Sequence, residues 1–248
     1  MLLYHYTSIE TLCAIAAFIS EGKITLRANN HKKMNDPNDC RYFIEETFRG
    51  MGSDKGKKDL LNLYEEYGNA YITSFSELQD DLHMWNCYGN HGHGIALGIN
   101  SYYLQEYAQT QIHNGIVSCL PLKCKYMHTD EIMKLYANTT LSNISSNTEI
   151  AKMVADTIVQ NTNLVKHPCY SYEQEWRIVF SGNKNDLEKY PDWLYNKTGD
   201  FFYIPIPLNE IKEIVIGPCC NMEAINRIFS PHFPETKFEK STVPFVDK

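Results

Sequence analysis

The chain has 248 residues, of which 43% are hydrophobic, 21% charged and 12% aromatic. A chain of this length and composition can bury a sizeable core, which excludes intrinsic disorder and is consistent with a single domain over residues 1–248. The formal net charge of -7 makes nonspecific nucleic-acid binding unlikely, because such binding depends on a clustered basic surface.

Two further features concern the expected location of the protein. The apolar run at 12–19 is much shorter than the ~20 residues of a membrane-spanning helix, and the first residues do not resemble a secretory signal. The 8 cysteines show no regular spacing, which argues against a disulfide scaffold. We therefore expect a cytoplasmic protein that does not interact with membranes.

The first part of the chain is expected to mix strands and helices. A strand at 2–6 precedes a helix that should run through Ile19, because Thr7 and Glu10 have the spacing of a capping box. Gly22 is expected to end that helix in a left-handed conformation. A second strand at 24–26 follows.

The next elements begin with Asn35-Asp36-Pro37, where the aspartate can cap a helix over 38–49 and proline suits its first turn. The polar stretch 50–58 is expected to be a loop, followed by a helix at 59–67. We then expect a strand at 70–76, a short helix at 82–88 and a strand at 94–99. This last strand is apolar on both faces, which is typical of a central strand.

The remainder of the chain is rich in strands. Strands are expected near 116–126, 175–180, 201–206, 212–216 and 236–243, and helices near 129–137, 149–165 and 221–229. The order favours an α+β fold, and no Gly-x-Gly-x-x-Gly sequence opens a helix as in dinucleotide-binding α/β proteins.

Three polar clusters interrupt these strand patterns: Tyr4-His5-Tyr6-Thr7, Thr73-Ser74-Phe75-Ser76-Glu77 and Tyr172-Glu173-Gln174-Glu175-Trp176-Arg177. Each has an ordinary structural explanation: a half-buried histidine, serines at a strand end and a charged strand edge. If the last strand includes Glu173, its carboxylate shares a face with that of Glu175, because strand side chains alternate. Two like charges on one face repel each other unless a cation or a reaction makes use of them.

Together the three clusters resemble the ADP-ribosyltransferase superfamily. The resemblance implies a split β-sheet core flanked by helices, with NAD as co-substrate. The opening His5-Tyr6-Thr7 is similar to the histidine–tyrosine–glutamate branch and to bacterial toxins that modify DNA bases. Ser74-Phe75-Ser76 and Glu173-Gln174-Glu175 are similar to the arginine–serine–glutamate branch, so the acceptor stays open.

A second resemblance covers most of the chain and is to a bacterial family known only as a domain of unknown function. The motifs that carry it are Leu3-Tyr4-His5-Tyr6-Thr7-Ser8, Met34-Asn35-Asp36-Pro37, Phe75-Ser76, Met84-Trp85-x-x-Tyr88 with Gly94, Tyr172-Glu173-x-Glu175-Trp176-Arg177 and Ile214-Val215-Ile216-Gly217-Pro218.

The transferase resemblance implies a role for each candidate residue. Cleavage of the bond between ribose and nicotinamide passes through an oxocarbenium-like state, which Glu175 is expected to stabilise while holding the ribose 2′-hydroxyl. Glu173 is expected to orient or deprotonate the acceptor. His5 and Ser74 are expected to bind the ribose and carboxamide ends of NAD, and Ser76 belongs to the serine strand that shapes the nicotinamide pocket.

The remaining candidates bind other parts of NAD. Tyr6, Trp85 or Tyr88 is expected to stack on nicotinamide, because flat cationic rings favour aromatic faces. Arg177 either pairs with a pyrophosphate oxygen or forms an ion pair with Glu173. The prediction requires His5, Ser74 and Glu175 to line one cleft between two sheets.

Three functional hypotheses follow. The first is an enzyme that transfers ADP-ribose from NAD to an unidentified macromolecule or hydrolyses NAD, with a toxin or phage-defence role implied by resemblance. The second is a non-catalytic nucleotide- or protein-binding module on the same fold. The third is a metal-dependent nuclease or hydrolase built on His83, His91 and His93, but no zinc-binding motif accompanies them, and we expect no metal site.

Overall fold

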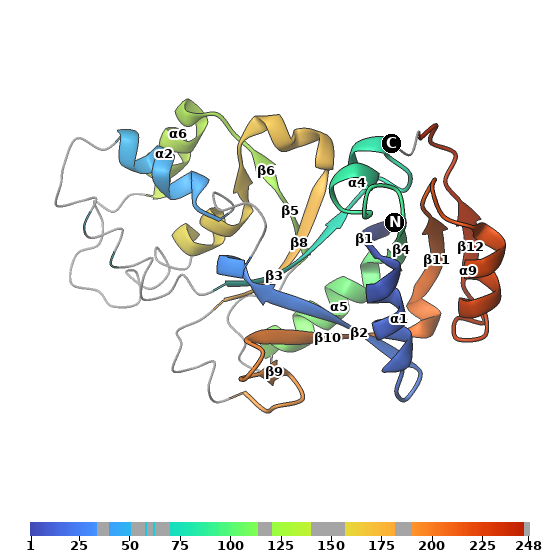
Figure 1. Ribbon diagram of the computed structural model, residues 1–248. Helices are drawn as coiled ribbons and strands as arrows, with labels where there is room; N and C mark the ends of the chain where they lie inside the picture. Colours follow the sequence, from blue (N-terminus) through green and yellow to red (C-terminus); the bar gives the residue numbers. More distant parts are fainter. Residues whose placement is uncertain are drawn as a thin grey trace.

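The computed structural model describes residues 1–33, 40–50, 58, 62, 70–113, 121–139, 157–181 and 190–245. Within these residues, a ten-stranded mixed sheet is flanked by helices, so the α+β class is confirmed (Figure 1). None of the helices in the described parts is both long and apolar enough to cross a bilayer. None of the seven cysteines among these residues forms a disulfide bond.

The strands are β1 (Leu2–Ser8), β2 (Lys23–Asn30), β3 (Ala70–Ser76), β4 (Gly94–Asn100), β5 (Pro121–Lys123), β6 (Lys125–Tyr126), β7 (Val165–Lys166), β8 (Glu175–Ser181), β9 (Tyr195–Asn196), β10 (Phe201–Pro207), β11 (Ile211–Ile216) and β12 (Lys237–Lys240). The α-helices with defined bounds are α1 (Ile9–Ala17), α2 (Tyr42–Gly50), α4 (Leu82–Cys87), α5 (Ser101–His113), α6 (Thr129–Thr139) and α9 (Met222–Phe229). The 3-10 helices are η1 (His31–Lys33), η3 (Pro168–Glu173) and η4 (Leu208–Glu210). Residues 157–164 are also helical.

The main path of the large sheet runs β12-β11-β4-β1-β3-β2-β10-β9, and β8 joins it by pairing with β3 and β5. The pairs are antiparallel except for β11 with β12. A separate two-stranded sheet joins β6 to β7 in parallel. As the apolar pattern at 94–99 predicts, β4 is a central strand, between β1 and β11.

One edge of β3 is shared by two strands that diverge from each other. Along the described chain, the pairing of β1 with β3 is confined to Tyr4 opposite Ser76, while β2 pairs with β3 at Ile72 and Tyr71. The segment of β3 between these contacts therefore has no strand partner on this edge, whereas β8 pairs with β3 along its whole length. The predicted cleft between two sheets is thus corrected to a gap within one continuous sheet.

The register assigns side chains to the two faces of β3 and β8. Residues directly opposite each other in an antiparallel pair share a face, and Ser74 lies opposite Arg177 and Ser76 opposite Glu175. These four polar residues therefore lie on one face. The other face carries Phe75, which packs into the main hydrophobic core.

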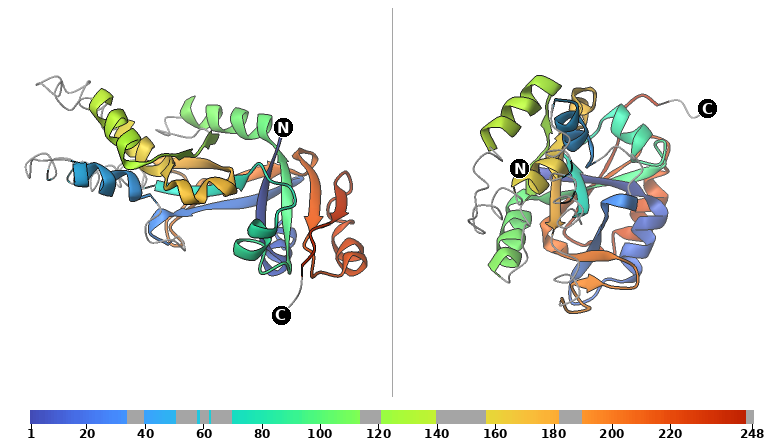
Figure 2. Two further views of the ribbon diagram at one scale, coloured as in Figure 1. Left: turned by 90° about the horizontal axis from the view of Figure 1, so that it is seen from above. Right: turned by 90° about the vertical axis from the view of Figure 1, so that its left-hand side faces the viewer.

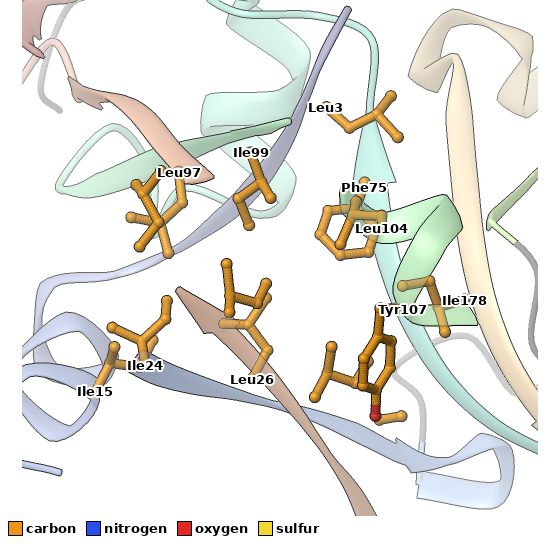
Figure 3. Close-up of a cluster of buried hydrophobic side chains, with 14 of the residues drawn as sticks. Leu3, Ile15, Ile24, Leu26, Phe75, Leu97, Ile99, Leu104, Tyr107 and Ile178 are labelled. Carbon is orange, nitrogen blue, oxygen red and sulfur yellow. The ribbon is translucent and has the colours of Figure 1, made fainter. Parts of the chain in front are cut away.

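This core fills the space between the sheet and its helices (Figure 3). The labelled members of the cluster are Leu3, Ile15, Ile24, Leu26, Phe75, Leu97, Ile99, Leu104, Tyr107 and Ile178. A separate cluster of Phe43, Ile44, Ile132, Ile158 and Val165 joins α2, α6 and the helix at 157–164. These helices lie at the end of the molecule opposite α9 (Figures 1 and 2).

The start of α1 differs from its prediction. Thr7 remains in β1, opposite Ile95 of β4, so it cannot form the predicted capping box with Glu10. Ser8 caps the helix instead, and its Oγ accepts a hydrogen bond from the Thr11 amide at 3.2 Å. The helix ends at Ala17 rather than Ile19, and Gly22, with a φ of 71°, lies in the turn into β2.

Several other elements also differ from those predicted. The helix α5 was not predicted, although Leu104, Tyr107 and Ala108 have helical spacing and are buried. The strand predicted near 116–126 consists, where described, of the short strands β5 and β6. The Asn35-Asp36-Pro37 motif and most of the predicted loop 50–58 and helix 59–67 lie outside the described residues.

Candidate functional site

A cavity of about 1000 Å³ lies where β1 and β2 diverge from β3. This volume is at the upper end of the range of ~300–1,000 Å³ for small-molecule sites. Its lining includes six of the nine predicted site residues, which come from distant parts of the chain: His5, Tyr6, Ser74, Tyr88, Glu173 and Glu175. The fold thus brings all three sequence clusters to one place.

His5 occupies the gap between β1 and β3. Its Nδ1 lies 2.9 Å from the carbonyl oxygen of Ser74, and a carbonyl can only accept, so Nδ1 donates. Burial lowers the pKa of the imidazole, although this hydrogen bond opposes the shift. His5 is therefore neutral near pH 7, and its Nε2 is left as a hydrogen-bond acceptor.

The two glutamates do not belong to one strand. Glu173 ends the 3-10 helix η3, Gln174 is left-handed with a φ of 45°, and Glu175 begins β8. The side chains nevertheless converge, because Lys166 Nζ lies 2.6 Å from Glu173 Oε2 and 2.9 Å from Glu175 Oε2. A shared ammonium group, rather than strand alternation, holds the two carboxylates together.

Glu175 is held on both of its oxygens. Arg177 donates from Nε to Oε1 at 2.8 Å and from Nη2 to Oε2 at 3.0 Å, and Lys166 adds a second cation. Burial alone raises the pKa of this carboxyl group, but the charges of Arg177 and Lys166 and hydrogen bonds from Arg177 and Ser74 lower it from 4.5 to about 2. Glu175 is ionised, buried and fully paired.

Glu173 is as deeply buried as Glu175, but only one of its oxygens is bound to a cation, Lys166. Its Oε1 accepts a hydrogen bond of 2.7 Å from the hydroxyl of Tyr88, a residue that is 40% exposed. Burial and the charge of Glu173 raise the pKa of Tyr88, so its hydroxyl stays protonated and donates. The oxygen Oε1 of Glu173 is therefore held by a neutral hydroxyl group, whereas Oε2 is held by the ammonium group of Lys166.

Three predicted site residues do not line the cavity. Ser76 is fully buried and donates to the backbone carbonyl of Glu173 at 2.6 Å. Trp85 is also buried; it donates to Asp80 at 2.6 Å and meets Tyr6 edge to face. Both side chains are buried and hydrogen-bonded to neighbouring residues. The ring of Trp85 is therefore not exposed to the cavity, and nicotinamide cannot stack on it as predicted.

Arg177 is the third of these residues. It is 1% exposed and donates from Nη1 to the carbonyl oxygen of Asn163 at 2.8 Å, besides its bonds to Glu175. Arg177 therefore pairs with Glu175 instead of the two predicted partners, a pyrophosphate oxygen and Glu173. The expectation of a pair with Glu173 assumed that the strand extends to that residue, and η3 replaces the strand there.

Sequence reasoning missed Lys166 and Arg27, which both line the cavity. Lys166 follows an apolar segment and is 7% exposed, and a buried lysine needs anionic partners. The lysine after two apolar residues in Leu164-Val165-Lys166 indicates a buried lysine, but this pattern does not identify its acidic partners.

His83, the first histidine of the metal hypothesis, has other contacts. His83 Nε2 lies 3.2 Å from Cys87 Sγ, and the ring of His83 lies edge to face with Tyr172 at 3.9 Å. Among the described residues, no group of three or more His, Cys, Asp or Glu side chains is arranged to hold a metal ion. The clustering of His83, His91 and His93 that this hypothesis requires is not found there.

Comparison with protein families gives one match. A family described as "Protein of unknown function (DUF2971)" matches residues 84–178, which include the Met84-Trp85-x-x-Tyr88 and Tyr172-to-Arg177 motifs but not the motifs before Met84 or after Arg177. No curated protein and no solved structure matches the chain. This part of the chain thus contains a DUF2971 domain, in agreement with the resemblance to a domain of unknown function.

Proposed function

We propose that the protein is an NAD-dependent ADP-ribosyltransferase-like enzyme that transfers ADP-ribose to a macromolecule or to water. The observation that carries the proposal is the cavity, in which His5 of β1, Ser74 of β3 and the pair Glu173 and Glu175 lie on one lining. A neutral imidazole acceptor, a hydroxyl and a carboxylate together suit the hydroxyls and amide of a nicotinamide riboside.

The reaction needs a negative group close to the ribose. The bond between C1′ and the nicotinamide nitrogen breaks with its electron pair leaving on nicotinamide, and positive charge develops on the ribose. An oxygen or nitrogen of the acceptor then bonds to C1′ and gives its proton to a carboxylate. When water is the acceptor, the products are nicotinamide, ADP-ribose and a proton.

The pairing of the glutamates suggests a change in their roles. Glu175, expected from the sequence to contact ribose, has both oxygens engaged by cations, which weakens its field at a developing positive charge. Glu173 has only one oxygen bound by a cation, Lys166, and the other accepts from the neutral hydroxyl of Tyr88. We therefore assign the contact with ribose or acceptor to Glu173, and to Glu175 the positioning of Lys166.

Nicotinamide release from NAD tests this function directly. Purified protein is expected to release nicotinamide, and Glu173→Gln is expected to lower the rate at least 100-fold, because the amide carries no charge and accepts no proton. Glu77→Gln is a matched control, since Glu77 binds Lys123 and Trp176 and does not line the cavity. An unchanged rate in Glu173→Gln contradicts the assignment, and a wild-type protein without release contradicts the function.

A second function is favoured by one specific observation, the complete pairing of Glu175. A site whose principal carboxylate is neutralised suits binding of a nucleotide better than stabilisation of a cation. In this alternative the chain is a nucleotide- or protein-binding module. ADP-ribose then raises the melting temperature, because it binds the folded state alone, while NAD is not consumed.

The toxin or phage-defence role implied by the resemblance belongs to the same proposal. Consumption of NAD deprives a cell of a central co-substrate, so induced expression in a bacterium is expected to lower cellular NAD and slow growth. The Glu173→Gln variant, expressed to the same level, is expected to do neither. Equal slowing of growth by both proteins contradicts an enzymatic toxin.

A further inference from the structure

We propose that Arg27 is the phosphate-binding residue of the cavity and takes the diphosphate group of a nucleotide. The inference deepens the proposed function and rests on it for the identity of the ligand as NAD. The geometry of Arg27 carries the inference, and the ligands that test it need not react.

Arg27 lies on the outward face of β2. Its neighbours Leu26 and Ala28 are buried in the main core, so the alternation of the strand turns Arg27 the other way, into the lining of the cavity. The guanidinium carbon lies 4.6 Å from the centre of the Phe201 ring. This stacking supports the planar group and leaves its N–H donors at the edge of the plane.

The guanidinium of Arg27 has no carboxylate partner among the described residues. The other two cations of the cavity lining are paired: Lys33 with Asp200 at 3.5 Å, and Lys166 with both glutamates of the site. Arg177, which is buried and does not line the cavity, is bound to Glu175. Within the described part of the chain, Arg27 is therefore the cation of the cavity lining that has no carboxylate partner.

The charge balance of the lining supports an anionic ligand. Asp200 balances Lys33, and the two glutamates balance Lys166 and Arg177. Among the described residues this leaves the charge of Arg27 in the lining, although the whole protein has a net charge of -7. An isolated positive group in a cavity of an acidic protein selects for negative ligands. Arginine in particular forms paired hydrogen bonds with phosphate oxygens.

Asn29 adds a second polar group on the face of β2 that lines the cavity. It follows Arg27 by one strand period, lies on the same face of β2 and also lines the cavity. The carboxylates come from η3 and β8. A ligand that reaches from Arg27 to Glu173 therefore needs a phosphate near Arg27 and a neutral or cationic group near Glu173. NAD provides both, because its central diphosphate carries the cationic nicotinamide riboside on one side.

The test measures ADP and adenosine binding by calorimetry at low salt. Arg27→Met keeps the apolar stem over Phe201 and removes the charge, and Arg27→Lys keeps the charge without the planar group. We expect Arg27→Met to weaken ADP binding at least tenfold and leave adenosine binding unchanged, with Arg27→Lys in between. Arg227→Met, an exposed arginine on α9, is the matched control and is expected to bind ADP like the wild type.

Other outcomes overturn the proposal. They are equal ADP binding by Arg27→Met and wild type, an equal loss for adenosine, or a wild-type protein that binds ADP no better than adenosine. Melting temperatures without ligand show whether each variant is folded; if Arg27→Met is not, Arg27→Gln takes its place.

Nicotinamide release separates this proposal from the proposed function. If the wild type binds ADP through Arg27 but releases no nicotinamide, the phosphate site stands and the enzymatic function fails. If the wild type releases nicotinamide and Arg27→Met has the same KM for NAD, the enzyme stands and the phosphate site fails.

Discussion

At the scale of single residues, the candidate site is governed by a compact group of opposite charges. Glu173, Glu175, Lys166 and Arg177 are each less than 9% exposed, and every one has an oppositely charged partner within 3 Å. A buried pair contributes little net stability while intact, but loss of one partner leaves an uncompensated charge away from water. The chemistry of the site and its stability are therefore linked.

Glutamate and glutamine have nearly the same shape, so shape alone predicts that Glu175→Gln has little effect on folding, whereas the charges predict a large one. In the structure, Glu175 is the carboxylate partner of Arg177. Glu175→Gln is expected to lower the free energy of unfolding by about 3–5 kcal/mol, measured by urea denaturation. Glu173→Gln should have a smaller effect, because Lys166 keeps Glu175 as a partner. Equal losses in the two variants would contradict this ranking.

The same carboxylate sets an expected pH dependence. The pKa of Glu175 is about 2 in the folded protein and 4.5 when unperturbed, so its ionisation stabilises the fold above about pH 4.5. This contribution is lost as the pH falls from about 4.5 towards 2. Urea midpoints measured across this range should fall more steeply for the wild type than for Glu175→Gln. Parallel curves would show that Glu175 titrates normally.

At the scale of elements, the short helix α4 presents one wall of the cavity. It has two turns at most, so it depends on its cap, and Asp81 Oδ1 accepts from the amides of His83 at 2.9 Å and Met84 at 3.0 Å. The helix carries Met84 and Cys87 to the cavity and is followed by Tyr88. The orientation of Tyr88 over Glu173 thus depends on a local cap.

Asp81→Ala is therefore expected to lower the free energy of unfolding by about 1 kcal/mol, because it removes the acceptor for two helical amides. Asp81→Asn keeps an acceptor oxygen and should retain most of the stability. Thermal and urea denaturation measure the effect. A loss in Asp81→Asn as large as in Asp81→Ala would mean that the charge, rather than the cap, stabilises α4.

At the scale of the whole molecule, Asp80 joins the centre of the chain to its C-terminal segment. Besides Trp85, its oxygens accept from Ser241 Oγ at 2.6 Å and from the amide of Thr242 at 2.7 Å. Burial raises the pKa of Asp80, but these hydrogen bonds outweigh it and the pKa is lowered. Two segments about 160 positions apart are thus held by one ionised carboxylate.

Asp80→Ala is expected to lower the free energy of unfolding by about 3 kcal/mol, because the buried N–H of Trp85 loses its acceptor together with the C-terminal contacts. Asp192→Ala is the control, since its side chain is 89% exposed and its removal should change stability little. Urea denaturation followed by tryptophan fluorescence measures both. A similar effect of the two substitutions would argue against a structural role for Asp80.

Much of the fold could be predicted because strand patterns are local. Apolar and β-branched residues at 70–76, 94–99 and 201–206 favour extended structure whatever surrounds them, and β3, β4 and β10 lie there. The start of α1 could not be placed in the same way, because Thr7 and Ser8 are both suitable caps. The pairing of Thr7 with β4 decided between them.

For the candidate site, the sequence by itself determined which segments carry polar groups: the first strand, the middle strand and the approach to β8. Tertiary structure alone decided that β1 leaves β3 after Tyr4, opening the cavity, and that Lys166 lies between Glu173 and Glu175. The physical reason is how far along the sequence each interaction acts. Alternation and capping act between residues a few positions apart, whereas ion pairing and strand divergence depend on distances in space that no local pattern encodes.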